Sequence, residues 1–216
     1  MRTVSQVVEE VIGRSPFLAE ALAEGIANNA EIARRIKPDI ERRLLEEVSE
    51  SSIAMALHRM SKKPKHLRFG LKFLKNISDI TVRSGLVELA FPSSIDLLPA
   101  LQALSRATKD KKEAFVNVSR GVRESLCIVN KEFEKAVLDA FPKGSRVRRT
   151  EGLSAITMHL PEASLNVPGL YYPILKALAF EGVSFVEIMS VDMEFSLVFR
   201  DEDTDRAFSV IKKLTS

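Results

Sequence analysis

The chain has 216 residues and a mass of 24.1 kDa, with 45% apolar and 28% charged residues. This composition is typical of globular proteins and excludes wholesale disorder, and the length favours one or two domains. The apolar runs are far shorter than the roughly 20 residues that cross a bilayer, so we expect no membrane span. Because Glu9 and Glu10 stand where a signal peptide would need apolar residues, the sequence predicts a cytoplasmic protein.

Residues that support catalysis or metal binding are sparse. Cys127 is the single cysteine, which rules out an internal disulfide and a thiolate zinc site, and its apolar neighbours predict burial. The histidines His58, His66 and His159 lack metal-ligand spacing. The phosphate-binding, dinucleotide-binding and nucleophile-elbow motifs are absent. We therefore expect a non-catalytic protein without a metal or cofactor.

Residues 1–70 are predicted to form an all-helical domain. Ser15 followed by Pro16 predicts the start of one helix, and residues 30–36 predict a second short helix. Pro38 is expected to open a third helix over about 38–48, and the serine-rich segment after it caps a last helix over about 50–61.

The end of this domain shows the strongest charge segregation in the chain. Between Ser51 and Ser78 there are seven Lys or Arg residues and no Asp or Glu. Such a segment could contact the phosphates of DNA; the candidate residues are Arg59, Lys62, Lys63, Lys65 and Arg68. The helices loosely resemble helix-turn-helix or winged-helix regulators, although the helix over 38–48 separates the two that would form the motif. A helical dimerisation or docking domain with solvated lysines is the alternative.

The rest of the chain predicts an α+β structure. Residues 79–150 and 151–216 each follow the order strand, helix, strand, strand, helix. Alternation of apolar and polar residues over 193–200 is typical of a strand with one buried face. We expect antiparallel strands with helices on one face, and the second repeat ends without an obvious fourth strand.

The most specific segment starts at a Pro-Gly turn. Pro168-Gly169 precedes a predicted helix over 171–181, and Gly182-Val183 leads into a strand. Gly169 allows a ligand to approach the backbone, and the free N–H groups of the helix start could bind an anion such as a carboxylate. A turn that simply starts a helix is the alternative.

This segment resembles the ACT domain, a βαββαβ module that binds amino acids and related effectors. The resemblance covers about 153–214 and is strongest to aspartokinase-type ACT domains, whereas 79–150 shares only the order of elements and has Phe91-Pro92-Ser93-Ser94 in place of the Pro-Gly turn. It implies two ferredoxin-like modules after the helical domain, the first of them degenerate. The effector-binding residues that it implies are Asn166, Val167, Pro168, Gly169, Leu170, Ser190 and Asp192.

The resemblance also implies a function. In tandem ACT pairs the modules interlace, so the missing strand is expected to come from elsewhere, and the effector is held between two modules within the chain or across a homodimer. The implied protein senses a small effector, an amino acid, and controls the helical domain. One form of such control is that of a DNA-binding transcriptional regulator. The alternative is an allosteric subunit that docks on a metabolic enzyme without binding DNA.

Overall fold

A computed structural model describes residues 2–62, 71–77, 79–142, 145, 147–164 and 166–215 of the chain, with only the backbone of residues 71 and 72. The chain divides into two compact units, which we describe separately. The N-terminal unit comprises Met1–Lys72 together with Pro168–Leu170, and the sheet unit comprises Phe73–Val167 and Tyr171–Ser216. Within the described residues, every helix is too short or too polar to cross a membrane.

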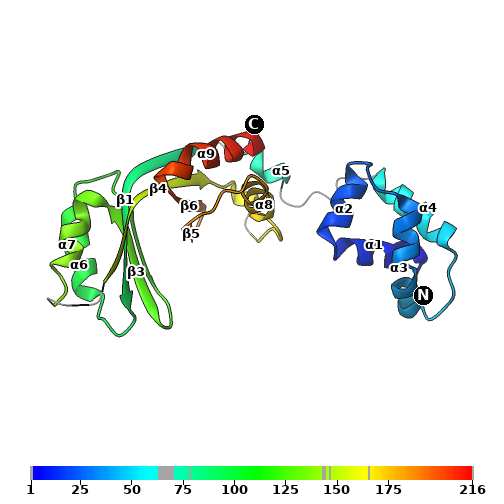
Figure 1. Cartoon of the computed structure of the whole chain (residues 1–216), viewed down its shortest axis with the longest axis horizontal. Coiled ribbons are helices and arrows are strands. Elements are labelled where there is room, and N and C mark those ends of the chain that lie inside the picture. The colour runs from blue at the N-terminus through cyan, green and yellow to red at the C-terminus, as the bar shows by residue number, and fades with distance from the viewer. Residues whose placement is uncertain are drawn as a thin grey trace. The chain divides into compact units, whose positions relative to one another are not determined.

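The N-terminal unit is built from amphipathic helices around one apolar core (Figure 1). They are α1 (Val4–Gly13), α2 (Pro16–Ala23), α3 (Asn29–Leu44) and α4 (Glu50–Ser61). Each helix contributes buried side chains to this core, among them Val8, Leu22, Ile40 and Leu57. Local capping fixes the helix starts: Thr3 and Gln6 form a reciprocal capping box on α1.

The prediction of two helices over 30–36 and 38–48 is wrong, because Pro38 lies inside the continuous helix α3. An internal proline removes one backbone hydrogen bond and costs about 3 kcal/mol. Ile36 and Ile40, one turn apart on either side of it, are both buried in the core, and their burial offsets that cost. The helix ends where Leu45 adopts a left-handed conformation (φ 59°). As a result α3 and α4 follow one another directly.

The sheet unit contains one antiparallel sheet of six strands in the order β2-β3-β1-β4-β6-β5. The α+β class is therefore confirmed. The strands are β1 (Ile80–Pro92), β2 (Val116–Arg120), β3 (Glu124–Asn130), β4 (Arg148–His159), β5 (Glu187–Val191) and β6 (Glu194–Arg200). The helices are α5 (Leu71–Leu74), α6 (Leu98–Thr108), η2 (Lys131–Phe133), α7 (Glu134–Leu138), η3 (Glu162–Ser164), α8 (Tyr172–Phe180) and α9 (Asp201–Thr215).

The two long strands β1 and β4 form the centre of this sheet. Each begins one strand-helix-strand-strand-helix repeat, and the two strands pair with each other. In consequence β4 completes a four-stranded set β2-β3-β1-β4, and β1 completes the set β5-β6-β4-β1. The strand that each repeat lacks is thus the first strand of the other repeat.

Two β-bulges lie symmetrically about the middle of the β1–β4 pair. Leu86 is opposite Leu153, and the register shifts by one residue on either side of this pair. The extra residues lie beside Gly85 and Gly152, which share the same left-handed backbone conformation (φ 71° in both). Bulges bend strands and increase their twist, so these glycines set the curvature of the sheet.

The helices α6, α7 and α9 pack on the same face of the sheet (Figure 1). Leu86 and Leu153 are paired across the two strands, so their side chains lie on the same face of the sheet. Val87 and Ser154, the next residues along each strand, therefore lie on the other face. Val87 packs in a cluster with side chains of α6 and α7, and the Ser154 hydroxyl donates to Asp201 at the start of α9 (2.6 Å). The face of Leu86 holds a smaller cluster to which no helix of the described part of the chain contributes: Leu86, Ile128, Leu153, Ala155, Met189 and Val198.

A buried acidic side chain lies on this helix-free face. Glu88 on β1 is only 4% exposed, and its Oε2 atom has no hydrogen-bond partner among the described residues. Burial and the nearby Glu187 carboxylate raise the pKa of Glu88; Arg148 lowers it less strongly, and Glu124 adds a small further rise.

A prediction follows for the bulge glycines. Alanine at Gly85 is expected to lower the free energy of unfolding by about 1–2 kcal/mol, because an L-residue is strained at positive φ, although a Cβ there would meet no neighbouring atom. Gly13, at the end of α1 with equally open surroundings, is the matched control, and alanine there should raise stability by about 0.4–1 kcal/mol. Equal effects of the two substitutions in urea unfolding would contradict the assignment of Gly85 as a conformational requirement.

A second prediction concerns pH. Since the pKa of Glu88 is raised in the folded chain, the folded state holds its proton more tightly than the unfolded state. The contribution to stability is therefore present at low pH and is lost as the pH rises through the folded pKa. Urea unfolding from about pH 5 to about pH 8 should show the wild type losing stability relative to Glu88→Gln. A constant difference between the two proteins over this range would show that Glu88 does not titrate as proposed.

Candidate functional site

The predicted effector-binding turn precedes α8 and is largely exposed. Asn166 and Gly169 both have left-handed backbones (φ 62° and 75°), and Asn166, Pro168 and Gly169 are exposed. Val167 is half-buried and Leu170 is buried. A φ of 75° requires glycine or imposes strain, so the type of residue at position 169 follows from the shape of the turn.

The helix after this turn begins later than the sequence predicted. Its first residue is Tyr172, with Tyr171 as the N-cap residue, so that 168–171 remain outside the helix. The N-cap residue Tyr171 makes no side-chain hydrogen bond to the helix start, and Pro173 in the first turn has no N–H group.

The other two predicted residues lie in and beside the β5–β6 turn. Ser190 and Asp192 are exposed, and Asp192 also has a left-handed backbone (φ 50°), which Asp tolerates better than most residues. The Tyr171 and Ser190 hydroxyls are 3.2 Å apart, and the Tyr171 ring stacks on Phe195 with centroids 4.1 Å apart. Tyr171 thereby joins the start of α8 to β5 and β6.

The sequence pattern placed Tyr171 at the start of the predicted helix over 171–181 and did not identify this link. An aromatic hydroxyl directly after a Pro-Gly turn was the available signal, because a half-buried tyrosine usually directs its hydroxyl to a polar partner.

The equivalent corner of the first repeat is closed by a side chain. The Arg120 guanidinium donates to the Ser93 carbonyl (2.7 Å), and the Ser93 hydroxyl donates to the Val122 carbonyl (2.9 Å). By strand register Arg120 corresponds to Ser190, since each pairs with the first inward residue of the next strand. The Arg120 side chain therefore closes the first corner, whereas Ser190, at the corresponding position of the second corner, carries only a hydroxyl group.

The predicted nucleic-acid-binding residues lie at the end of the N-terminal unit. Arg59 is exposed on α4 and donates to the Ser5 hydroxyl (2.9 Å), and Lys62 is the exposed C-cap residue. Lys63, Lys65 and Arg68 lie outside the described residues. The face of α4 opposite its buried side is exposed. Its residues are Ser51, Ser52, Met55, His58, Arg59 and Lys62.

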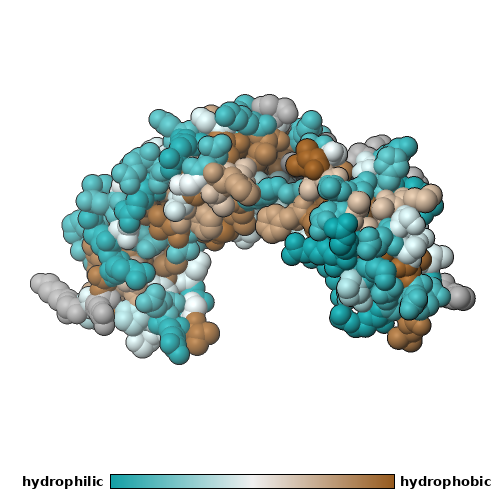
Figure 2. Space-filling model, turned by 45° about the vertical axis from the view of Figure 1, so that its right-hand side comes forward, coloured by the Kyte–Doolittle hydropathy of each residue, from teal (hydrophilic) through white to brown (hydrophobic). Residues whose placement is uncertain are grey.

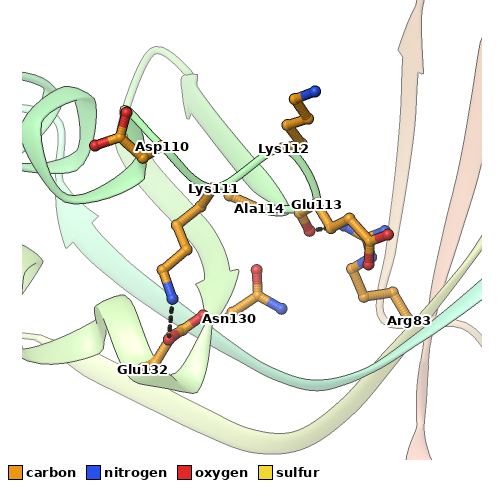
Figure 3. Close-up of a pocket in the computed structure, with 8 residues that line it drawn as sticks. All are labelled: Arg83, Asp110, Lys111, Lys112, Glu113, Ala114, Asn130 and Glu132. Atoms are coloured by element: carbon orange, nitrogen blue, oxygen red, sulfur yellow. Dashed lines mark hydrogen bonds and ion pairs between the residues drawn. The ribbon is translucent and has the colours of Figure 1, made fainter.

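One pocket, of about 420 Å³, lies between the end of α6 and the first repeat's strands (Figure 3). Three of its charged side chains already have partners: Lys111 reaches Glu132 (3.7 Å), and Arg83 donates to the Glu113 carbonyl. The Asn130 side chain accepts the backbone N–H of Phe115 (2.7 Å). A ligand here would have to displace these contacts.

The described residues contain no group of three or more His, Cys, Asp or Glu side chains that could hold a metal ion. Cys127 is buried, and its burial raises the pKa of the thiol to about 11. At that pKa the thiolate, which is the nucleophilic form, is scarce near neutral pH.

Comparison with known proteins identifies the fold of the sheet unit. No protein-family model matches the chain. No curated protein sequence matches it either. The ligand-free regulatory subunit of aspartate kinase from Thermus thermophilus has a similar structure, with a TM-score of 0.52 and 13% identity over 65% of this chain and 99% of that subunit. The corresponding subunit from Thermus flavus gives a TM-score of 0.50 and 14% identity over 65% and 99% of the two chains.

A full enzyme also matches. Aspartate kinase from Clostridium acetobutylicum has a TM-score of 0.52 and 12% identity over 65% of this chain, which spans only 35% of that enzyme's length. At these identities the likeness shows the fold alone. The sheet unit has the ACT-type fold found in the regulatory part of aspartate kinases.

Proposed function

We propose that this chain is a non-catalytic regulatory protein that senses an amino acid. The observation that carries the proposal is the fold of the sheet unit, which matches a regulatory subunit of aspartate kinase over 99% of that subunit. The domain arrangement in this proposal is a helical domain (1–70), a degenerate ACT-like module (79–150) and an ACT domain (151–216). The second module binds the effector and controls the helical domain.

The effector site in this proposal consists of the turn Asn166–Leu170 with Ser190 and Asp192. The positive end of the α8 dipole, which follows the turn at Gly169, suits the effector's carboxylate, and the Asp192 carboxylate suits its ammonium group. The contrast between the two corners supports this choice, because Arg120 closes the first and Ser190 leaves the second exposed.

Regulation requires that the effector bind two arrangements of the protein with different affinities. A coupling free energy of about 1–3 kcal/mol is typical of allosteric proteins. A homodimer would provide two such arrangements. The strands β2 and β5, which end the sheet on either side, each have one edge without a partner strand in the described chain and could pair with a second copy.

DNA is the first candidate for the output of the helical domain. Two observations support it. The consecutive helices α3 and α4 are joined by residues 45–49 alone, without the intervening helix that the sequence predicted. The exposed face of α4 also leads into the basic segment with Lys62, Lys63 and Lys65, whose cations could contact phosphates.

Docking on a partner enzyme is the second candidate, and the charge of the folded helices favours it. Residues 2–62 contain nine Lys or Arg and ten Asp or Glu, so the helices themselves are not basic. Several large apolar side chains of this unit are exposed and could be covered by a partner, and Figure 2 shows brown spots on a mostly teal surface. They are Phe17, Ile26, Leu45 and Met55.

The sensing proposal predicts a ligand-dependent melting temperature. At 100 times its Kd, an amino acid should add about 2.7 kcal/mol of stability, which is about 5–10 °C for a chain of this size. Gly169→Ala should abolish this shift because a Cβ would block the approach to the backbone. Gly182→Ala is the control, since Gly182 also has a positive φ (64°) and open surroundings. The sensing proposal fails if none of the twenty standard amino acids raises the melting temperature.

The DNA proposal predicts a salt-dependent affinity for duplex DNA. Each lysine that contacts a phosphate contributes about one unit to the slope of log K against log salt. Replacing Lys62, Lys63 and Lys65 together by alanine should therefore reduce the slope by about 2–3. Lys212 and Lys213, in the last turn of α9, provide a control double substitution. Absence of duplex binding at low salt would favour the docking candidate.

A further inference from the structure

The helix-free face of the first repeat carries a buried acid that nothing in the proposed effector site uses. Glu88 is 4% exposed and its Oε2 atom has no partner among the described residues. Leaving a buried polar atom unpaired typically costs about 1–3 kcal/mol, and more for a charged group. A ligand that supplies a hydrogen-bond donor to this oxygen would remove that cost.

Strand register places cations beside this acid. Glu88 and Ala90 are two residues apart on β1 and so share a face. Ala90 is opposite Arg148 on β4, and Pro92 is opposite Glu124 on β3. Glu88 and Arg148 are therefore diagonal neighbours, whose Cβ atoms are about 7–8 Å apart in a regular antiparallel pair.

A pocket of about 320 Å³ opens over this part of the sheet. The small side chain of Ala90 leaves space on β1, and Arg148 and Glu124 extend across it from the flanking strands, with Nη2 and Oε2 3.8 Å apart. Both of these side chains are 67% exposed, so their ion pair contributes little and is easily opened. The lining residues are Ala90, Phe91, Pro92, Arg123, Glu124 and Arg148. Glu88 is not itself a lining residue; it lies two residues from Ala90 on the same face of β1, close enough to Arg148 and Glu124 for their charges to act on it.

We propose that this surface, the Glu88–Arg148 strip, binds a small zwitterion with one ammonium and one carboxylate group. The ammonium donates to the unpaired oxygen of Glu88, and the carboxylate accepts from the guanidinium of Arg148, with Arg123 at the rim. Guanidinium groups bind carboxylates through two parallel hydrogen bonds, which fixes the orientation of the ligand.

The mixed charge of the strip argues against simpler ions. A lone anion at Arg148 would face Glu124 and the buried Glu88, and a lone cation at Glu88 would face Arg148. Only a molecule that carries both charges satisfies both sides. The strip lies on β1, β3 and β4, on the opposite face of the sheet from Tyr171 and Ser190. It is thus a second site, independent of the proposed effector turn.

Titration of the ¹⁵N-labelled full chain with each of the twenty standard amino acids, followed by NMR, tests this proposal. At least one amino acid should shift the backbone amide signals of Glu88, Ala90 and Arg148 in a saturable manner. Acetate and methylammonium, which each carry one of the two charges, should bind at least about tenfold more weakly. Failure of all twenty amino acids to shift these signals would overturn the proposal, as would binding of acetate as tight as that of the amino acid.

Substitutions separate the strip from the effector turn. Glu88→Gln and Arg148→Met should each weaken binding at the strip at least about tenfold, while the unchanged remainder of the spectrum shows that the variants fold. Glu202→Gln and Arg106→Met, on exposed positions of α9 and α6, are the matched controls. Wild-type affinity in both strip variants would overturn the proposal. Gly169→Ala should leave the strip signals responsive, so signals that respond only near Ser190 would refute the strip and leave the sensing proposal standing.

Discussion

The structure of the sheet unit depends on the pairing of β1 with β4. These strands begin the two repeats, and each supplies the neighbour that the other repeat lacks. A three-stranded repeat alone would leave the edge of its first strand without a partner. Pairing the two first strands satisfies both sets of backbone groups at once. The repeats therefore stabilise each other, and neither is a separate sheet.

The same pairing explains the curvature of the sheet and its unequal faces. The bulges at Gly85 and Gly152 flank Leu86 and Leu153 and increase the twist of both strands. Helices cover one face, whereas the other face holds a buried apolar cluster to which no helix of the described chain contributes. Phe115, Leu126 and Val186 pack against this cluster from the strands and loops of the sheet unit. Glu88 is buried on the same face.

Near-symmetry of the backbone combined with asymmetry of the side chains gives the two repeats different surfaces. The Ser93 N–H donates to the Arg123 carbonyl (2.9 Å), and Leu160 donates to Met193 in the same way (2.8 Å). On this common frame, Arg120 ties one corner and the Tyr171–Ser190 contact shapes the other. Duplication of one fold supplies two positions for a site, and the side chains decide which position can accept a ligand.

The sequence by itself determined the elements that depend on local chemistry. Alternation over 193–200 predicted β6, Ser15-Pro16 predicted the start of α2, and Pro168-Gly169 predicted a turn with positive φ, because these patterns act through the backbone of a few adjacent residues. Local rules failed at Pro38, where burial of side chains from the whole helical unit keeps α3 continuous. The β1–β4 pairing and the burial of Glu88 were decided by tertiary structure alone. The pairing joins residues 58 to 78 positions apart in the chain. A charged residue within an apolar strand shows in the sequence only that some other group must compensate for its burial.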